Sequence, residues 1–221
     1  MKIFIPYLHT GDSRSLKYTL RSIEKFMPNT GVVICGSEIP KWLRNVEFIK
    51  YDDQPGVRNK GNNTHGKMLH CLDRLGEDFI AYSDDFFLLK KWEYQNYCWR
   101  NLLDVFRPNN WGEAVKNTMQ LIGNAVSFEV HCPIVFNSAK IKALNVEPVD
   151  FGHCVKSLYC HTYNIQGVSY PDVKFRSTRF KENIQFIIAG RKFFSTHPDS
   201  WNGDMEAVME ELYPERSWYE G

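Results

Sequence analysis

Apolar and polar residues along the first ninety positions alternate in a way that predicts interleaved strands and helices. Four short runs rich in Ile, Val and Phe predict buried strands, at residues 2–7, 31–36, 45–51 and 78–85. Apolar residues recur at helical spacing after the first run, which predicts a helix with one buried face: Leu16, Leu20, Ile23 and Met27. A second such set precedes the fourth strand: Met68, Leu69, Leu72 and Leu75. This order of elements is typical of an α/β fold with a mostly parallel sheet flanked by helices.

The second half of the chain is less regular. Its patterns predict helices at residues 94–106 and 111–122 and a strand at 126–136. They also predict paired late strands within 183–197 and a terminal helix over 203–214, which Pro214 ends. Because no repeat, low-complexity run or linker interrupts the chain, we expect a single domain over residues 1–221.

Three polar loops follow predicted strands, at residues 6–14, 52–67 and 83–85. Residues 51–63 in particular are polar and carry Gly and Pro, which predicts a flexible loop. In parallel sheets, ligands bind beyond the carboxyl ends of the strands. We therefore expect these three loops to meet at one ligand-binding edge.

Composition narrows the class of protein. The 221 residues are 43% hydrophobic and 14% aromatic, which supports a packed core and argues against disorder. A net charge of +1 argues against strong nonspecific binding of nucleic acid. No run approaches the roughly 20 apolar residues of a membrane span, and the amino-terminal run lacks the features of a signal peptide. These features predict a cytoplasmic protein.

Six cysteines are scattered along the chain, and the absence of an export signal favours reduced thiols. Three His–Cys neighbours combine the residue types of a zinc site, at 131–132, 153–154 and 160–161. No Cys-x-x-Cys spacing accompanies them, and structural zinc sites usually show tight ligand spacing. The pattern favours buried, small apolar cysteines, with a structural zinc as the alternative.

The adjacent carboxylates Asp84 and Asp85 stand at the end of the fourth predicted strand. Neighbouring strand residues point to opposite faces, so both can reach one ligand only where the strand bends. Carboxylate oxygens suit Mg²⁺ or Mn²⁺, which share their other positions with substrate phosphates. The alternative is a pair of turn residues, since Asp often bonds its own backbone. Their place at the expected ligand edge favours function.

Three segments resemble nucleotide-sugar glycosyltransferases of the GT-A fold: "IPYL", "SLKYTLRSIEKF" and "FIAYSDDFFLL". The resemblance implies a Rossmann-like sheet, a donor half at 1–90 and an acceptor half at 91–221. It also implies transfer of a sugar, as in hexosyltransferases, from a nucleotide-sugar such as a UDP-sugar to an acceptor hydroxyl, assisted by Mn²⁺ or Mg²⁺. That family's acidic Asp-x-Asp motif binds the metal; here Ser83 replaces its first Asp. Asp85 matches the metal-binding position, with Asp84 as its partner in donor binding and catalysis.

Other segments resemble narrower groups. "IPYLHTGDSRSLKYTLRSI", "SDDFFLL" and "EVHCPIVF" are similar to Stealth-type sugar-phosphate transferases, which make microbial surface polysaccharides. "YPERSWYE" resembles small glycosyltransferase-like proteins of bacteriophages, which would place the protein in the host cytoplasm. Three readings follow: transfer of a sugar, transfer of a sugar phosphate, or a non-catalytic nucleotide- or carbohydrate-binding module. The acceptor would be a phage or bacterial glycan, a protein or a hydroxymethylated DNA base.

The GT-A resemblance also implies roles in binding the donor. Loop residues after the first strand would hold the base and ribose: Pro6, Tyr7 and Thr10. The ring of Tyr7 can stack on a base or serve as an aromatic at the edge of the core. Charge and hydrogen bonds for the diphosphate and sugar would come from Arg14, Lys67 and Asn62 or Asn63. For the two cations, solvation at the surface is the alternative.

His131 lies in the Stealth-like block, where the resemblance implies an active-site residue. Beside Glu129, it can act as a base toward an acceptor hydroxyl, and the two residues share a face if the segment is a strand. A hydrogen-bonded core histidine is the alternative. His197 follows a late strand, where GT-A enzymes often complete the metal shell, although a loop histidine is the simpler interpretation.

A late run of charged residues combines one acid with four bases: Asp172, Lys174, Arg176, Arg179 and Lys181. Such a run can hold an anionic acceptor or the leaving phosphate. A solvated face is the ordinary alternative.

Overall fold

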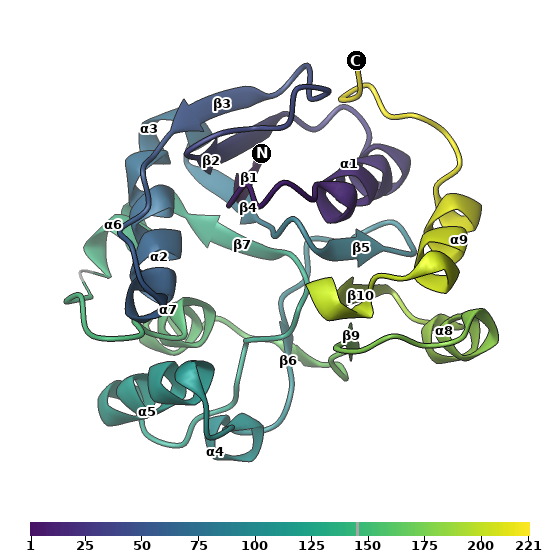
Figure 1. The fold of residues 1–221 in the computed structure, drawn as a ribbon. Coiled ribbons are helices and arrows are strands. Elements are labelled where there is room, and N and C mark those ends of the chain that lie inside the picture. Colours follow the sequence, from purple (N-terminus) through teal and green to yellow (C-terminus); the bar gives the residue numbers. More distant parts are fainter. Residues whose placement is uncertain (145) are drawn as a thin grey trace.

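The computed structural model describes residues 1–144 and 146–221, and its centre is a five-stranded sheet in the order β3-β2-β1-β4-β7 (Figure 1). Four strands run parallel: β1 (Lys2–Pro6), β2 (Val32–Gly36), β3 (Glu47–Lys50) and β4 (Asp78–Ala81). The fifth, β7 (Ile134–Asn137), pairs antiparallel with β4. The predicted mostly parallel sheet is therefore confirmed.

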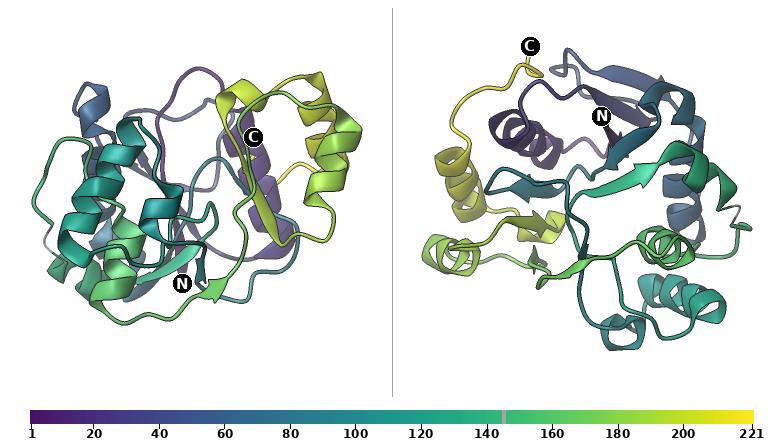
Figure 2. Two further views of the ribbon diagram at one scale, coloured as in Figure 1. Left: turned by 90° about the horizontal axis from the view of Figure 1, so that it is seen from below. Right: turned by 180° about the vertical axis from the view of Figure 1, so that it is seen from behind.

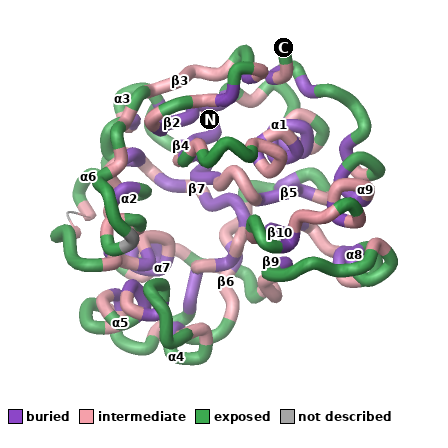
Figure 3. The backbone as a smooth tube through the Cα atoms, viewed as in Figure 1, coloured by how far each residue is buried: buried purple, intermediate pink, exposed green. Residues whose placement is uncertain are grey.

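Helices cover both faces of this sheet because the central strands are apolar on both sides. Ile3 and Ile5 of β1 pack in one layer with helix α1 (Arg14–Phe26), whereas Phe4 points into the opposite layer. That second layer contains Met68 of helix α2 (Lys60–His70), followed by the short helix α3 (Leu72–Leu75). Figure 3 shows the buried positions concentrated along these strands and the inner sides of the helices.

A second sheet of three short strands extends the first. Strand β10 (Phe193–Thr196) lies between β5 (Phe86–Leu88), which is antiparallel to it, and β9 (Lys174–Phe175), which is parallel. Helices α8 (Lys181–Ile188) and α9 (Gly203–Leu212) complete its core around Phe87 and Phe194. The chain passes from β4 to β5 within four residues, so these sheets meet where the acidic pair lies.

The remaining elements form a layer below the central sheet in Figure 1. Strands β6 (Tyr97–Cys98) and β8 (Val168–Ser169) pair in parallel. The helices here are α4 (Leu102–Val105), α5 (Asn110–Ile122) and α7 (Val155–Thr162), whereas α6 (Ser138–Ala143) follows β7 at the side of the sheet. Two 3-10 turns, η1 (Val57–Asn59) and η2 (Pro198–Ser200), precede α2 and α9. Figure 2 shows α5 and α7 side by side, apart from α8 and α9.

Three sequence-based predictions in the second half are wrong. The run 183–190 is not a strand but most of α8, because Ile184 and Ile188 lie one helical turn apart and both are buried. Short apolar runs do not distinguish a strand from a buried helix. Within 94–106, only Leu102–Val105 is α-helical, since residues 97–98 pair with β8.

The predicted strand at 126–136 is also largely wrong. Its regular pairing begins only at Ile134, and the residues before it cross beneath the sheet without a ladder. In the first half, α2 begins at Lys60, so the predicted loop at 51–63 is helical in its last part. The helices at 111–122 and 203–214 are confirmed, as α5 and α9. Among the described residues, no helix combines the length and apolar character that a membrane crossing requires.

Candidate functional site

The acidic pair lies at the bend that connects the two sheets. Thr19 of α1 fixes this bend, because its buried hydroxyl reaches the backbone carbonyls of Asp84 at 2.9 Å and Phe86 at 3.0 Å. Two adjacent carboxylates can reach one ligand only where the strand bends, and the chain bends at this point. It follows β4 directly, at the carboxyl edge of the central sheet.

Asp85 forms an ion pair with Lys174, the first residue of β9. Lys174 Nζ lies 2.8 Å from Asp85 Oδ2, and the two side chains are 13% and 20% exposed. A mostly desolvated pair of this kind is held in place by its surroundings, unlike a surface pair. The site therefore contains a fixed positive charge next to its carboxylates.

Asp84 has a perturbed acidity. Burial, followed by the neighbouring charge of Asp85, raises the pKa of Asp84 to about 7. Both causes disfavour the ionised form of Asp84, as expected for one of two close carboxylates. A bound cation would relieve this repulsion.

His131 is held by Asp172 through two contacts. The backbone N–H of His131 donates to Asp172 Oδ1 at 2.9 Å, and the ring Nδ1 lies 2.7 Å from Oδ2. Burial acts to raise the pKa of Asp172, but the hydrogen bonds and charge of His131 outweigh it, so that this pKa lies below its usual value. Across the described residues, Nε2 of His131 takes part in no hydrogen bond, and the side chain is 26% exposed.

Phe86 connects the histidine to the acidic pair. Its ring meets that of His131 edge to face, with 6.0 Å between centroids, and it directly follows Asp85. Lys156 lies over the same ring at 5.0 Å and donates to the carbonyls of Val130 and Cys132, each at 2.9 Å. The loop that carries His131 is thus fixed on both sides of the histidine.

Strand β9 and the residues before it join the two polar pairs into one site. Asp172 contacts His131, and Lys174, two residues later, contacts Asp85. Side chains at i and i+2 of an extended segment share a face. One short segment therefore presents an acid to the histidine and a base to the acidic pair.

Glu129, which the sequence pairs with His131, lies elsewhere. Its Oε1 accepts from the backbone N–H of Ser157 at 2.9 Å and from the Ser157 hydroxyl at 3.1 Å. Ser157 is in the first turn of α7, so Glu129 caps that helix. Because residues 129 and 131 are not in a strand, the expected shared face does not form, and Asp172 is the partner of His131.

His197 is brought to the acidic pair by its backbone. Strand pairing places Ser195 opposite Phe86, and the N–H of Thr196 donates to the carbonyl of Asp85 at 3.2 Å. His197 is the next residue. Its side chain is 44% exposed, and Nδ1 accepts from the N–H of Asp199 at 3.3 Å.

The residues proposed for the base and ribose follow β1. Pro6 ends the strand, Thr10 is exposed, and the ring of Tyr7 is buried in the core. The Tyr7 hydroxyl lies 3.1 Å from Nδ1 of His9. Burial, with the charge of Asp84, raises the pKa of Tyr7. In this structure Tyr7 is therefore an aromatic of the core, and its ring offers no free face for stacking.

Lys67 and Asn63 fix the loop after β3. The buried ammonium of Lys67 donates to the carbonyl of Tyr7 at 3.0 Å and to Asp53 Oδ2 at 2.8 Å. The side-chain amide of Asn63 forms two hydrogen bonds with the backbone of Gln54. These contacts join the loops that follow β1 and β3, so both residues shape the carboxyl edge.

The other predicted polar residues lie nearer the surface. Asn62 donates to the carbonyl of Val149 at 2.8 Å. Arg14 pairs with Asp12 at 2.6 Å and lies 5.5 Å from the Trp201 ring centroid. In the late charged run, Lys181 pairs with Glu211, while two exposed residues follow β9: Arg176 and Arg179.

The carboxylates of Asp84 and Asp85 fit a hard cation. Mg²⁺ typically takes one or two protein carboxylates and completes its shell with water and substrate phosphates, so two are sufficient. Among residues 1–144 and 146–221, no group of three or more His, Cys, Asp or Glu side chains surrounds a common metal position. The six cysteines are free, and five of them are buried, as expected for small apolar residues.

Sequence patterns miss two residues of this site and the partners of two others. Nothing in the sequence connects Lys156 or Phe86 to the histidine, because both contacts depend on distant elements. For Asp172 and Lys174, a signal exists: an acid and a base two apart in an extended segment. That spacing predicts a shared face but not the partners on it.

Comparisons with solved structures show the fold. The crystal structure of an active-site mutant of LgtC matches with a TM-score of 0.52 at 13% identity, over 96% of this chain and 95% of that one. The galactosyltransferase LgtC in complex with donor and acceptor sugar analogues matches with a TM-score of 0.50 at 13% identity, over 97% and 95%. No protein-family model and no curated protein matches the sequence. The chain has the α/β GT-A fold.

Proposed function

We propose that this protein is a glycosyltransferase that uses a nucleotide-sugar donor. The observation that carries the proposal is the arrangement around β9, where Asp172 holds His131 and Lys174 pairs with Asp85. Direct displacement of a diphosphate by an acceptor hydroxyl can use both a base and an acidic pair that holds a cation. The likeness to a galactosyltransferase with donor and acceptor analogues supports the same reaction class.

The donor diphosphate would bind at the bend between the sheets. Asp84 and Asp85 would hold Mg²⁺ or Mn²⁺, which supplies positive charge to the departing diphosphate. Lys174 would offset charge on the same oxygens from the protein side. Pro6, Thr10 and His197 border this edge, and Lys67 keeps the loops in place.

His131 would act on the acceptor. With Nδ1 held by Asp172, its Nε2 can take the proton of an acceptor hydroxyl. The acceptor oxygen then forms a bond to the anomeric carbon, and the bond from that carbon to the diphosphate oxygen breaks. Asp172 orients the ring and stabilises the imidazolium that forms.

Transfer of a sugar phosphate is a second candidate, favoured by the Stealth-like block around His131. The same base would direct the acceptor oxygen to phosphorus, and a nucleoside monophosphate would leave. For either reaction we propose an acceptor hydroxyl on a glycan, a protein or a hydroxymethylated DNA base. A DNA acceptor would have to leave the base stack to reach the site.

The test is incubation of the protein with a panel of nucleotide-sugars, Mn²⁺ and candidate acceptors, with detection of the released nucleotide. Release of a nucleoside diphosphate supports sugar transfer, and release of a monophosphate supports sugar-phosphate transfer. Either activity should be lost in Asp85→Ala and kept in Asp73→Ala, a control carboxylate that is 76% exposed on α3. If no donor of the panel binds by calorimetry with or without Mn²⁺, the enzyme proposals are wrong, and a binding module of other specificity is left.

A further inference from the structure

A concave surface lies at the edge of the central sheet opposite the acidic pair, around Trp218. This half-open hollow has a volume of about 430 Å³ and is lined by Glu24, Asn29, Thr30, Gly31, Asn45, Trp218 and Tyr219. Gly31 directly precedes β2 and Asn45 comes shortly before β3, so this cavity is at the amino ends of the strands. Its volume is in the range of small-molecule sites. The acidic pair lies at the carboxyl ends, so the two sites are separate.

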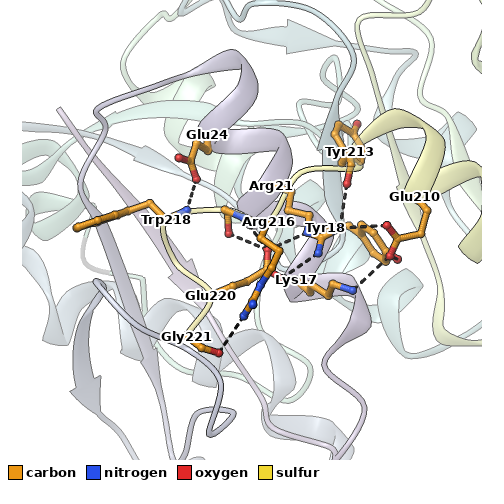
Figure 4. A network of polar contacts seen from close by, with 11 residues as sticks. Lys17, Tyr18, Arg21, Glu24, Glu210, Tyr213, Arg216, Trp218, Glu220 and Gly221 are labelled. Carbon is orange, nitrogen blue, oxygen red and sulfur yellow. Dashed lines mark hydrogen bonds and ion pairs between the residues drawn. The ribbon is translucent and has the colours of Figure 1, made fainter.

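Trp218 is exposed although its backbone is fixed. Its N–H donates to Glu24 and its carbonyl accepts from Asn45 Nδ2 at 2.7 Å. The hydroxyl of the next residue, Tyr219, donates to the carbonyl of Thr30 at 2.8 Å. Even so, 68% of Trp218 is accessible, against 39% for Trp111. Figure 4 shows the indole extending away from α1 and from the other labelled side chains.

The rim of the cavity has the polar groups that hydroxyls need. Asn29 and Asn45 both adopt left-handed backbone conformations, with φ of 61° and 54°, a region that Asn enters more readily than most residues. A side-chain amide offers donors and an acceptor together, and a sugar hydroxyl is likewise both. Thr30 adds a further hydroxyl to the lining.

Charge decides which class of ligand suits the cavity. Its lining contains one carboxylate, Glu24, and no Lys, Arg or His. A phosphate, nucleotide or acidic sugar would therefore meet repulsion with no cation to offset it. A flat apolar platform beside uncharged hydrogen-bonding groups instead matches a neutral pyranose, which has C–H groups on one face and hydroxyls at its edge.

We propose that the cavity at Trp218 is a binding site for a neutral saccharide. The ring of the sugar lies on the indole, and its hydroxyls contact the amides of Asn29 and Asn45. Because the backbone of Trp218 is already fixed, binding costs little conformational entropy. The site does not rest on the proposed transferase function, since it shares no residue with the bend between the sheets.

The test uses three neutral probes: methyl β-galactopyranoside, methyl β-glucopyranoside and N,N′-diacetylchitobiose. Binding is followed by tryptophan fluorescence and by the shift of indole N–H signals in isotope-labelled protein, at sugar concentrations up to about 10 mM. We expect at least one probe to move the Trp218 signal, and glucuronic acid to leave it unchanged. If none of the neutral probes moves it, the proposal is wrong.

Three variants locate the binding. Trp218→Ala should weaken it by about tenfold or more, and Trp111→Ala, the control on α5, should leave it unchanged. Trp218→Leu keeps an apolar side chain and serves if the alanine variant folds poorly. Asp85→Ala should retain the sugar, because a loss would place it at the first site and contradict the proposal. Equal binding by wild type and both Trp218 variants would contradict it as well.

Discussion

Asp172 contacts both the backbone N–H and the ring of His131, so a single carboxylate sets the position and the tautomer of the proposed base. Neutral imidazole with its proton on Nδ1 presents a lone pair on Nε2, which is the form a base requires. Glu129 lacks this relation, because its oxygen caps α7. Asp172 and Glu129 thus have separable roles.

Replacing Asp172 with Asn tests the positioning role. The amide keeps the shape of the carboxylate but loses its charge, so kcat should fall by about 10²-fold or more while donor affinity stays the same. The acid limb of the pH–rate profile should move as well, which a purely structural role would not produce. Glu129→Gln is the matched control: we expect a lower midpoint of thermal unfolding with kcat nearly unchanged. Equal kcat for Asp172→Asn and wild type would contradict the assignment.

Lys174 is the second residue with a specific prediction. Lys174→Met removes the ammonium from Asp85 and should weaken the binding of a nucleoside diphosphate by about tenfold or more, measured by calorimetry with Mn²⁺. Lys174→Arg keeps the charge and should retain most of the affinity. If Lys174→Met binds the diphosphate as tightly as wild type does, Lys174 contributes only to the stability of the fold and not to donor binding.

The carboxyl-terminal segment after α9 has a structural role that its sequence pattern does not predict. It returns across α1 toward the amino ends of the strands, where Glu220 meets Arg21 (Figure 4). Arg21 Nε lies 2.8 Å from Glu220 Oε1, and the side chains are 6% and 8% exposed. Arg21 Nη1 also lies 3.2 Å from Glu210 Oε2, so removing Glu220 leaves Arg21 with one carboxylate partner and should cost less than the roughly 3–5 kcal/mol of a fully unpaired buried charge.

Glu220 should make stability depend on pH. Burial acts to raise the pKa of Glu220, but Arg21 and the N–H of Ser217 lower it by more, so that its folded pKa lies below the unfolded value of about 4.3. The stabilisation from ionised Glu220 is therefore complete above that pH and is lost as pH falls through the folded pKa. Urea titrations should show Glu220→Gln to be less stable at pH 7, with the difference narrowing in acid. Asp150→Asn, which breaks an exposed pair with Arg58, should change stability by less than about 1 kcal/mol at either pH.

Local patterns could predict most of the first half of the fold, but in the second half they predict the helices α5 and α9 and miss most of the short strands. Strands β1, β2 and β4 of the central sheet each contain at least three consecutive apolar, mostly buried residues, which are visible in the sequence itself. The second sheet includes the two-residue strand β9, which exists only because it pairs with β10. Likewise, residues 183–188 are helical because α9 offers a surface for Ile184 and Ile188. Such elements are set by distant partners, which a local pattern does not contain.

The same distinction applies to the candidate site. Asp84 and Asp85 are predicted as site residues from their position, because the carboxyl edge of a parallel sheet can be predicted once its strands are known. The partnership of His131 with Asp172 spans 41 positions, and that of Asp85 with Lys174 spans 89. Residue types along the chain suggest that each has a role, but only the folded chain determines which of them meet.

At the scale of the whole molecule, Thr19 joins the two sheets at the site. It is fully buried on α1, and its one hydroxyl lies within hydrogen-bonding distance of two carbonyls on either side of Asp85, those of Asp84 and Phe86. Thr19→Val keeps the shape but leaves both carbonyls without this partner, so we expect a loss of about 1–3 kcal/mol in unfolding free energy. Because the bend carries the acidic pair, affinity for a nucleoside diphosphate should fall with it.

Thr19→Ser separates these effects from simple repacking. Serine restores the hydroxyl but leaves out a methyl group, so its donor affinity should match wild type even though its stability is slightly lower. Hydrogen exchange of the amides in β5 and β10 should accelerate in the valine variant and stay slow in the serine variant. Were both variants to lose affinity equally, packing around the methyl group, and not the hydroxyl, would hold the sheets and the acidic pair in register.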